Sequence, residues 1–274
     1  MVIGLIGAQN SHAAHFLKAI NGEKLFDGVS VGFIYGGDDP ATAARLTAEY
    51  GLKECPDEKT VIKNSDAVAI TYRRGSLHHN AAMKVLCARK PVFIDKPFTS
   101  DEREAQEIVE YASRNGLLIC GGSNTKGLRG VADVSEKIKP GDTVVISYCA
   151  NPEDEYDGYW FYGIHSVEVC LELLGLNYNA VSAVCNGGTV VSTISYPDNT
   201  CVLITAPEVH SLDITVFDKN VGTHYPIELD YQSIGPCDLI DMVRSGKPPR
   251  EYDFYAASVR LLNEIICQAG LSWS

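Results

Sequence analysis

The sequence lacks long apolar runs, paired cysteines and an excess of basic charge. No stretch of its 274 residues stays apolar over the roughly 20 residues that a membrane-spanning helix needs. The 9 cysteines are scattered, without a Cys-x-x-Cys pair, which favours reduced core thiols over a disulfide framework. Its 23 basic against 35 acidic residues give a net charge of −12, which disfavours nucleic acid and membrane surfaces as partners.

Two further absences concern targeting and metals. The strand-like run Val2–Ile6 has no basic segment before it and no small-residue cleavage site after it, so we expect a cytoplasmic protein. The possible metal ligands are His12, His15, His78, His165 and Glu168. No His-Glu-x-x-His or paired-cysteine pattern organises them, so we expect no metal.

What is present in the first half is an alternation of strands and helices. Each apolar run is followed by a segment with helical spacing, and this alternation predicts parallel strands joined by right-handed crossovers. The expected strands are 2–6, 29–35, 66–71, 92–94 and 117–120. We therefore predict a doubly wound α/β domain over residues 1–122.

The second half has a different pattern, which predicts an α+β domain over residues 123–274. Strand-like runs are joined by turns and favour a largely antiparallel sheet. The runs are 144–149, 181–185, 190–196, 201–205 and 212–217. A helix at 164–174 interrupts them, with Val167 and Leu171 facing the core and His165, Glu168 and Glu172 on the other side.

The turn after the first strand is a candidate cofactor site. A dinucleotide fingerprint needs three glycines, and here Gly7 holds the first place while Gln9 and His12 hold the others. Ser11 is a possible N-cap of the next helix, whose free backbone donors could hold an anion. An ordinary strand-helix turn is an equally good interpretation. Asp38, after the second strand, could hold an adenosine ribose, and no basic residue follows it directly, which favours NAD over NADP.

Charged residues also follow two later strands. Asp95-Lys96-Pro97 ends the run 92–94, and in an open α/β sheet ligands bind beyond the carboxyl ends of the strands. A surface ion pair is the alternative. Arg73-Arg74 follows the strand 66–71 and could bind a cofactor phosphate or a substrate carboxylate, or lie in a solvated loop.

The order of these features resembles the Gfo/Idh/MocA oxidoreductases along nearly the whole chain. The residues that carry the resemblance are the Gly7 turn, the strand at 66–68, His78, Asp95-Lys96-Pro97, Gly163-Ile164-His165 and Gly246-Lys247-Pro248-Pro249. The resemblance implies an N-terminal Rossmann domain and a second domain with an open, largely antiparallel sheet through which two or four copies associate. It also implies hydride transfer between NAD or NADP and a sugar, polyol or related hydroxy compound.

The resemblance further implies roles for individual residues. Lys96 and His165 become the catalytic pair, and Lys96, Arg74, Tyr162 and His165 contact the substrate. The residues expected to bind the cofactor are Gly7, Ala8, Gln9, Asn10, Ser11, His12, Asp38, Thr71, Arg73, His78 and Asp95. Pro97 is expected to follow a cis peptide bond.

One departure from the family pattern concerns the catalytic histidine. The family usually carries an aspartate four residues before it, and here that place is Phe161. Tyr156, Tyr159 or Tyr162 could replace the missing hydrogen-bonding group. The departures at Gln9, His12 and Phe161 leave two alternatives open, namely a non-catalytic binding protein and a lyase or isomerase with tightly bound NAD.

Overall fold

The structure, a computed structural model, describes residues 1–271 and divides into two compact units. The first unit comprises residues 1–99, 103–122 and 232–255, and the second comprises residues 100–102, 123–231 and the chain from 256 onward. The expected second domain of residues 123–274 therefore differs from the second unit at 232–255. The reason is helix α8 (Ile234–Ser245), whose Leu239, Ile240 and Met242 are buried in the core of the first unit.

A six-stranded parallel sheet forms the centre of the first unit. Its order is β3-β2-β1-β4-β5-β6, the order of a dinucleotide-binding Rossmann fold. The strands are β1 (Val2–Ile6), β2 (Ser30–Tyr35), β3 (Lys53–Glu54), β4 (Ala67–Ile70), β5 (Val92–Ile94) and β6 (Ile119–Gly121). The predicted doubly wound parallel sheet is thus confirmed, with the short edge strand β3 added.

Helices follow these strands as the sequence pattern predicts. They are α1 (Ser11–Leu17), continued by a π-helical turn (Lys18–Gly22), α2 (Pro40–Tyr50), α3 (Glu58–Asn64), α4 (His78–Cys87) and α5 (Glu102–Asn115). Helix α2 shows why the local sequence folds in this way. The Asp39 side chain accepts a hydrogen bond from the Thr42 backbone N–H, Pro40 occupies the first turn, and Gly51 ends the helix in the left-handed conformation.

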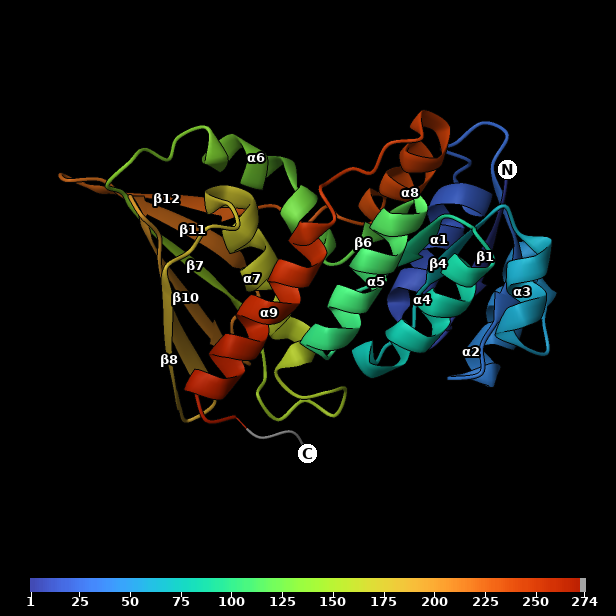
Figure 1. The fold of residues 1–274 in the computed structure, drawn as a ribbon, viewed down its shortest axis with the longest axis horizontal. Coiled ribbons are helices and arrows are strands. Elements are labelled where there is room, and N and C mark those ends of the chain that lie inside the picture. The colour runs from blue at the N-terminus through green and yellow to red at the C-terminus, as the bar shows by residue number, and fades with distance from the viewer. Residues whose placement is uncertain (272–274) are drawn as a thin grey trace. The chain divides into compact units, whose positions relative to one another are not determined.

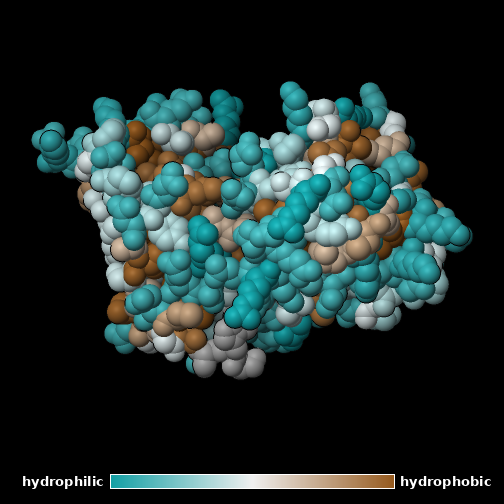
Figure 2. Space-filling view, in the orientation of Figure 1, coloured by the Kyte–Doolittle hydropathy of each residue, from teal (hydrophilic) through white to brown (hydrophobic). Residues whose placement is uncertain are grey.

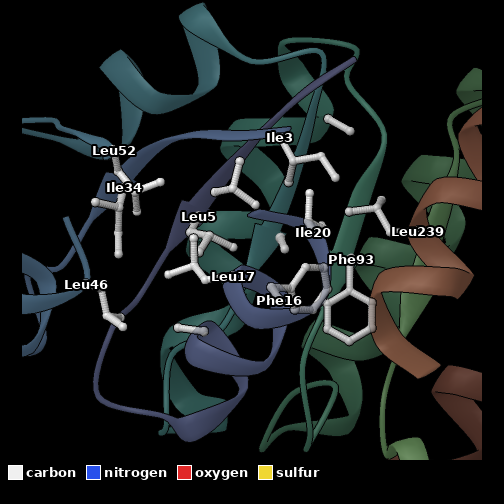
Figure 3. Close-up of a cluster of buried hydrophobic side chains, with 14 of the residues drawn as sticks. Ile3, Leu5, Phe16, Leu17, Ile20, Ile34, Leu46, Leu52, Phe93 and Leu239 are labelled. Carbon is white, nitrogen blue, oxygen red and sulfur yellow. The ribbon is translucent and has the colours of Figure 1, made fainter. Parts of the chain in front are cut away.

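The core of the first unit lies between the sheet and its helices (Figure 3). Ile3 and Leu5 of β1 are fully buried, as expected for a strand covered on both faces. The rings of Phe16 in α1 and Phe93 in β5 meet edge to face with centroids 5.1 Å apart. This contact fixes α1 against the centre of the sheet and so sets where the turn after β1 lies.

The second unit is built on a six-stranded sheet of order β12-β11-β7-β10-β9-β8. Every neighbouring pair is antiparallel except β7 and β10, so the predicted largely antiparallel sheet is confirmed. The strands are β7 (Thr143–Cys149), β8 (Ala180–Asn186), β9 (Thr189–Ser195), β10 (Thr200–Ala206), β11 (Leu212–Phe217) and β12 (Gly222–Ile227). The helical elements are a 3-10 turn (Asn124–Gly127), α6 (Arg129–Ser135), α7 (Trp160–Leu174) and most of α9 (Asp253–Gln268).

The two faces of this sheet have different surroundings. Along β7, β9 and β10, buried residues such as Ile146, Ile194 and Leu203 alternate with half-buried Val145 and Val202. Figure 1 shows α6 and α7 on one side of the sheet, while on its other side no helix of residues 1–271 covers the strands. The sheet is therefore open on one face.

Among residues 1–271, no helix combines the length and the apolar character needed to cross a membrane. Figure 2 shows a visible surface that is mostly hydrophilic, with hydrophobic patches scattered over it.

Candidate functional site

In the first unit, the turn after β1 is shaped by one glycine. Gly7 has φ +100°, and an added Cβ would lie 2.5 Å from the Tyr72 backbone nitrogen and 2.7 Å from the Thr71 carbonyl carbon. The Thr71 hydroxyl donates to the Gly7 carbonyl at 2.9 Å. Two of the predicted site residues, Gly7 and Thr71, are thus brought together at the carboxyl ends of β1 and β4, where the strand order reverses.

Asp38 lies against the same turn. Its carboxylate accepts hydrogen bonds from the backbone N–H groups of Ala8 at 2.8 Å and Gln9 at 3.2 Å. The side chain is half-buried at the end of β2. That position is where a Rossmann fold places the acid that holds the adenosine ribose.

The N-cap of α1 is Asn10, whose side chain accepts from the His12 backbone N–H, and not Ser11 as the sequence suggested. Ser11 is exposed in the first turn of the helix. The N-cap is one residue earlier than predicted, because Asn is as good an N-cap as Ser and the Asn10 amide also reaches the end of β5. That amide donates to Asp95 at 2.8 Å.

His12 and Asp95 form a buried pair. His12 Nδ1 lies 2.7 and 2.8 Å from the two Asp95 carboxylate oxygens, and Asp95 is fully buried. Burial alone raises the pKa of Asp95, but attraction and hydrogen bonding from His12, with a smaller contribution from Lys96, lower that pKa below its usual value. His12, which replaces a fingerprint glycine, therefore connects the turn after β1 to the end of β5.

Lys96 follows Asp95 and is 3% exposed, and the Lys96–Pro97 peptide bond is cis as expected. The alternative of a surface ion pair at this strand end is wrong, because both charged side chains are buried. Two buried charges at the carboxyl end of a central strand are typical of a functional site.

His78 is also buried, but against backbone. Its Nδ1 lies 2.7 Å from the Pro97 carbonyl oxygen and its Nε2 lies 3.0 Å from that of Tyr72. The ring thus joins the segments that follow β4 and β5. Of the arginine pair after β4, Arg73 is half-buried and Arg74 is exposed.

These residues fit a dinucleotide. The sheet order, the glycine-backed turn after β1 and the half-buried acid after β2 are the parts that a Rossmann site uses to approach a pyrophosphate and hold a ribose. The side chains of Gln9 and His12 stand where close backbone approach is usual, so this turn would hold the group with side chains as well as backbone.

In the second unit, His165 lies in the second turn of α7, because the helix begins at Trp160 and not at Ile164. It is 6% exposed. His165 Nδ1 lies 2.6 Å from the Ser123 hydroxyl oxygen. The Tyr162 ring lies 5.1 Å and the Tyr148 ring 5.6 Å from its ring, centroid to centroid.

A buried ion pair adjoins this histidine. Lys126 Nζ lies 2.8 Å from Glu168 Oε2, with the two side chains 3% and 0% exposed. The Ser123 backbone N–H donates to Glu168 at 2.9 Å, and Lys126 donates to the Ser123 carbonyl at 2.6 Å. The expectation that His165 and Glu168 lie on the side of the helix away from the core is wrong. Partners on the segment after β6 allow both to be buried.

The residue that contacts His165 Nδ1 is Ser123, which the sequence did not suggest. Among the tyrosines considered, Tyr159 points elsewhere, with its hydroxyl 2.7 Å from that of Thr205. Phe161 packs against the rings of Tyr156 and Tyr162. The only signal for Ser123 was its place at the carboxyl end of a strand, just after Gly121-Gly122. Within residues 1–271, no cluster of three or more histidine, cysteine or acidic side chains is arranged to hold a metal ion.

Comparison with known proteins gives the family of the first part of this chain. Residues 1–122 match the model of the GFO_IDH_MocA family, described as an oxidoreductase family with an NAD-binding Rossmann fold. This match assigns residues 1–122 to the NAD-binding Rossmann domain of the Gfo/Idh/MocA oxidoreductases. A search among curated proteins finds no significant sequence match.

Solved structures share the fold along nearly the whole chain. GenD2 from gentamicin A biosynthesis, in complex with NAD, has a TM-score of 0.84 at 14% identity, covering 98% of this chain and 94% of its own. Myo-inositol dehydrogenase from Lactobacillus casei, in complex with NAD(H) and myo-inositol, has a TM-score of 0.81 at 17% sequence identity. The match covers 98% of this chain and 94% of that one. UDP-N-acetylglucosamine 3-dehydrogenase GnnA from Acidithiobacillus ferrooxidans has a TM-score of 0.81 at 14% sequence identity. The match covers 98% of this chain and 97% of that one.

Proposed function

We propose that this protein is a cytoplasmic oxidoreductase that moves hydride between NAD and a sugar, polyol or related hydroxy compound. The observation that carries the proposal is the buried Asp95-Lys96 pair at the carboxyl end of β5, in a sheet with the dinucleotide-binding order. The similar structures support the substrate class, since two of them are named as dehydrogenases of myo-inositol and of a nucleotide sugar.

Oxidation of an alcohol removes a hydride from carbon and a proton from oxygen. Bound NAD supplies the hydride acceptor. Lys96, as the neutral amine, accepts the hydroxyl proton and becomes an ammonium group. His165 is the second acid/base group, and Tyr162, whose ring adjoins it, and Arg74 contact the substrate.

The turn after β1 would hold the cofactor. Gly7, Ala8, Gln9, Asn10, Ser11 and His12 would hold its pyrophosphate, Asp38 would accept from its ribose hydroxyls, and Thr71, Arg73, His78 and Asp95 would complete the site. Asp38 favours NAD over NADP, because a carboxylate beside the ribose repels a 2′-phosphate.

We also propose that two or four copies associate through the open face of the second unit's sheet. Half-buried apolar residues of the central strands, among them Val145, Val202 and Ile204, line that face. A strand surface of this kind is usually covered in a stable protein.

Calorimetry with NAD(H) and NADP(H), together with nicotinamide absorbance on a panel that includes myo-inositol and UDP-N-acetylglucosamine, tests the function. We expect NAD(H) binding and turnover of at least one substrate. Lys96→Met should lower kcat at least about 100-fold while NAD still binds. Lys59→Ala, at an exposed lysine of α3, is the control. Absence of both binding and turnover would refute the proposal, and cofactor that survives gel filtration would favour the lyase or isomerase alternative.

A further inference from the structure

We propose that a pair of hydroxyl groups, Ser123 and Thr125, positions His165 and sets which of its ring nitrogens carries the proton. These hydroxyls take the place of a carboxylate partner, and because they can reverse their hydrogen bonds they can satisfy either neutral tautomer of His165. The catalytic meaning of this inference rests on the proposed function of His165.

The hydrogen-bond count around Ser123 supports the proposal. Its hydroxyl oxygen lies 2.6 Å from His165 Nδ1, 2.6 Å from the Thr125 hydroxyl oxygen and 3.1 Å from the Thr125 backbone nitrogen. The backbone N–H can only donate, so it occupies one acceptor position of the Ser123 oxygen. One proton and one acceptor position remain to serve His165 and the Thr125 hydroxyl.

Only two arrangements of the neutral ring satisfy this count. In the first, Thr125 donates to Ser123 and Ser123 donates to Nδ1, so that the neutral histidine carries its proton on Nε2. In the second, Nδ1–H donates to Ser123 and Ser123 donates to Thr125, which leaves the lone pair of a base on Nε2. The ring stays in place, two hydroxyl groups reorient, and the ring proton moves between Nε2 and Nδ1 by exchange with water. A carboxylate can only accept, so it would hold the proton on Nδ1.

The backbone of Ser123 is fixed on both sides by buried charge. Glu168 accepts from its N–H and Lys126 donates to its carbonyl, while Lys126 and Glu168 pair with each other at 2.8 Å. The rings of Tyr148 on β7 and Tyr162 on α7 also face His165. Burial raises the pKa of Tyr148, so its hydroxyl stays neutral. The hydroxyl pair is therefore the element of this cluster that can rearrange without separating charges.

Substitutions at Thr125 test the inference, because valine matches threonine in volume and removes only the hydroxyl. In the first arrangement Thr125→Val removes the donation to Ser123 but keeps the Ser123 hydrogen bond to Nδ1, whereas in the second it leaves the Ser123 hydroxyl proton without an acceptor. The tautomer ratio of His165 should then move at least about fivefold toward the Nε2–H form, the ratio equivalent to one neutral hydrogen bond. Thr125→Ser keeps the hydroxyl and should retain the original ratio. Ser192→Ala, which removes a buried hydroxyl in β9, is the control for folding.

The measurement is the long-range ¹H–¹⁵N NMR spectrum of the histidine ring in the full chain, without substrate. In the active enzyme, Thr125→Val should also lower kcat about 10-fold or more, change the pH profile and leave KM near its original value, whereas Thr125→Ser should retain activity. An unchanged tautomer ratio in folded Thr125→Val would overturn the inference. Absence of dehydrogenase turnover would overturn the proposed function alone, since the NMR result does not depend on it.

Discussion

At the scale of single residues, the turn after β1 is held by side chains where glycines are usual. His12 and Asn10 both reach Asp95, so the end of β5 and the turn are connected by three hydrogen-bonding groups inside the protein. Because Asp95 is fully buried, its negative charge depends on these partners and on the neighbouring Lys96. The arrangement makes the turn a part of the charged cluster.

The pKa of Asp95 predicts a dependence of stability on pH. The folded protein lowers this pKa below 3.8, so the ionised carboxylate stabilises the fold above that pH, and the contribution is lost as the pH falls through the lowered value. We expect Asp95→Asn to reduce the free energy of unfolding by roughly 1–3 kcal/mol at pH 7, because the new amide donors face those of Asn10 and His12. Urea titration at pH 7 and at pH 3 should show the difference shrinking in acid.

The control is Asp198→Asn, at an exposed turn between β9 and β10. It should change the unfolding free energy little at either pH. A difference between Asp95→Asn and the original protein that grows as the pH falls would contradict the expected sign of this dependence.

At the scale of elements, the second unit depends on the connection between α7 and the segment after β6. Lys126→Met leaves the Glu168 carboxylate buried without its partner, and the loss of one member of such a pair costs about 3–5 kcal/mol of unfolding free energy. The double variant Lys126→Met, Glu168→Gln removes the uncompensated charge while retaining an acceptor for the Ser123 N–H. It should recover a large part of the loss in a urea titration.

An exposed ion pair provides the comparison. Arg129 and Asp133 of α6 lie 3.9 Å apart with side chains 94% and 67% exposed, so Arg129→Met should have little effect. Equal losses for Arg129→Met and Lys126→Met would show that burial is not the cause.

Most elements could be predicted from the sequence because their signals are local. The continuous apolar runs of β4 and β5, and Asp39, Pro40 and Gly51 around α2, each specify a structure within a few residues. Fewer contacts of the site could be predicted from the sequence. Asp95 and Lys96 could be found from the strand end, whereas the contact of Ser123 with His165 joins residues 42 positions apart and leaves no local pattern.

The length of α7 was also underestimated, for a related reason. Trp160 and Phe161 lie in its first turn and are buried, but the preceding acidic and aromatic residues are typical of a loop. A helix that began at Ile164 would have His165 in its first turn. The sequence pattern therefore predicts that His165 and Glu168 lie outside the core. Burial on nearly every side of a helix erases the periodicity that marks its inner face.

At the scale of the whole molecule, the open sheet face predicts an oligomer that one charge can weaken. Ile204 is a half-buried residue of the central strand β10 on that face. Ile204→Lys should raise the dissociation constant of the assembly by at least about 10-fold, because a buried unpaired ammonium costs more than the lost apolar contact. Analytical ultracentrifugation measures the effect. If the unsubstituted protein stays monomeric at high concentration, the proposed association is refuted.

The return of the chain to the first unit has a consequence for how the protein is made. Residues 1–122 carry all six strands of the first sheet, yet Leu239, Ile240 and Met242 of α8 complete its core. A ribosome must therefore synthesise nearly the entire second unit before the first can close its interior. Until α8 emerges, the nascent dinucleotide-binding sheet keeps an apolar surface exposed, so this interval is when the growing chain most needs protection from aggregation.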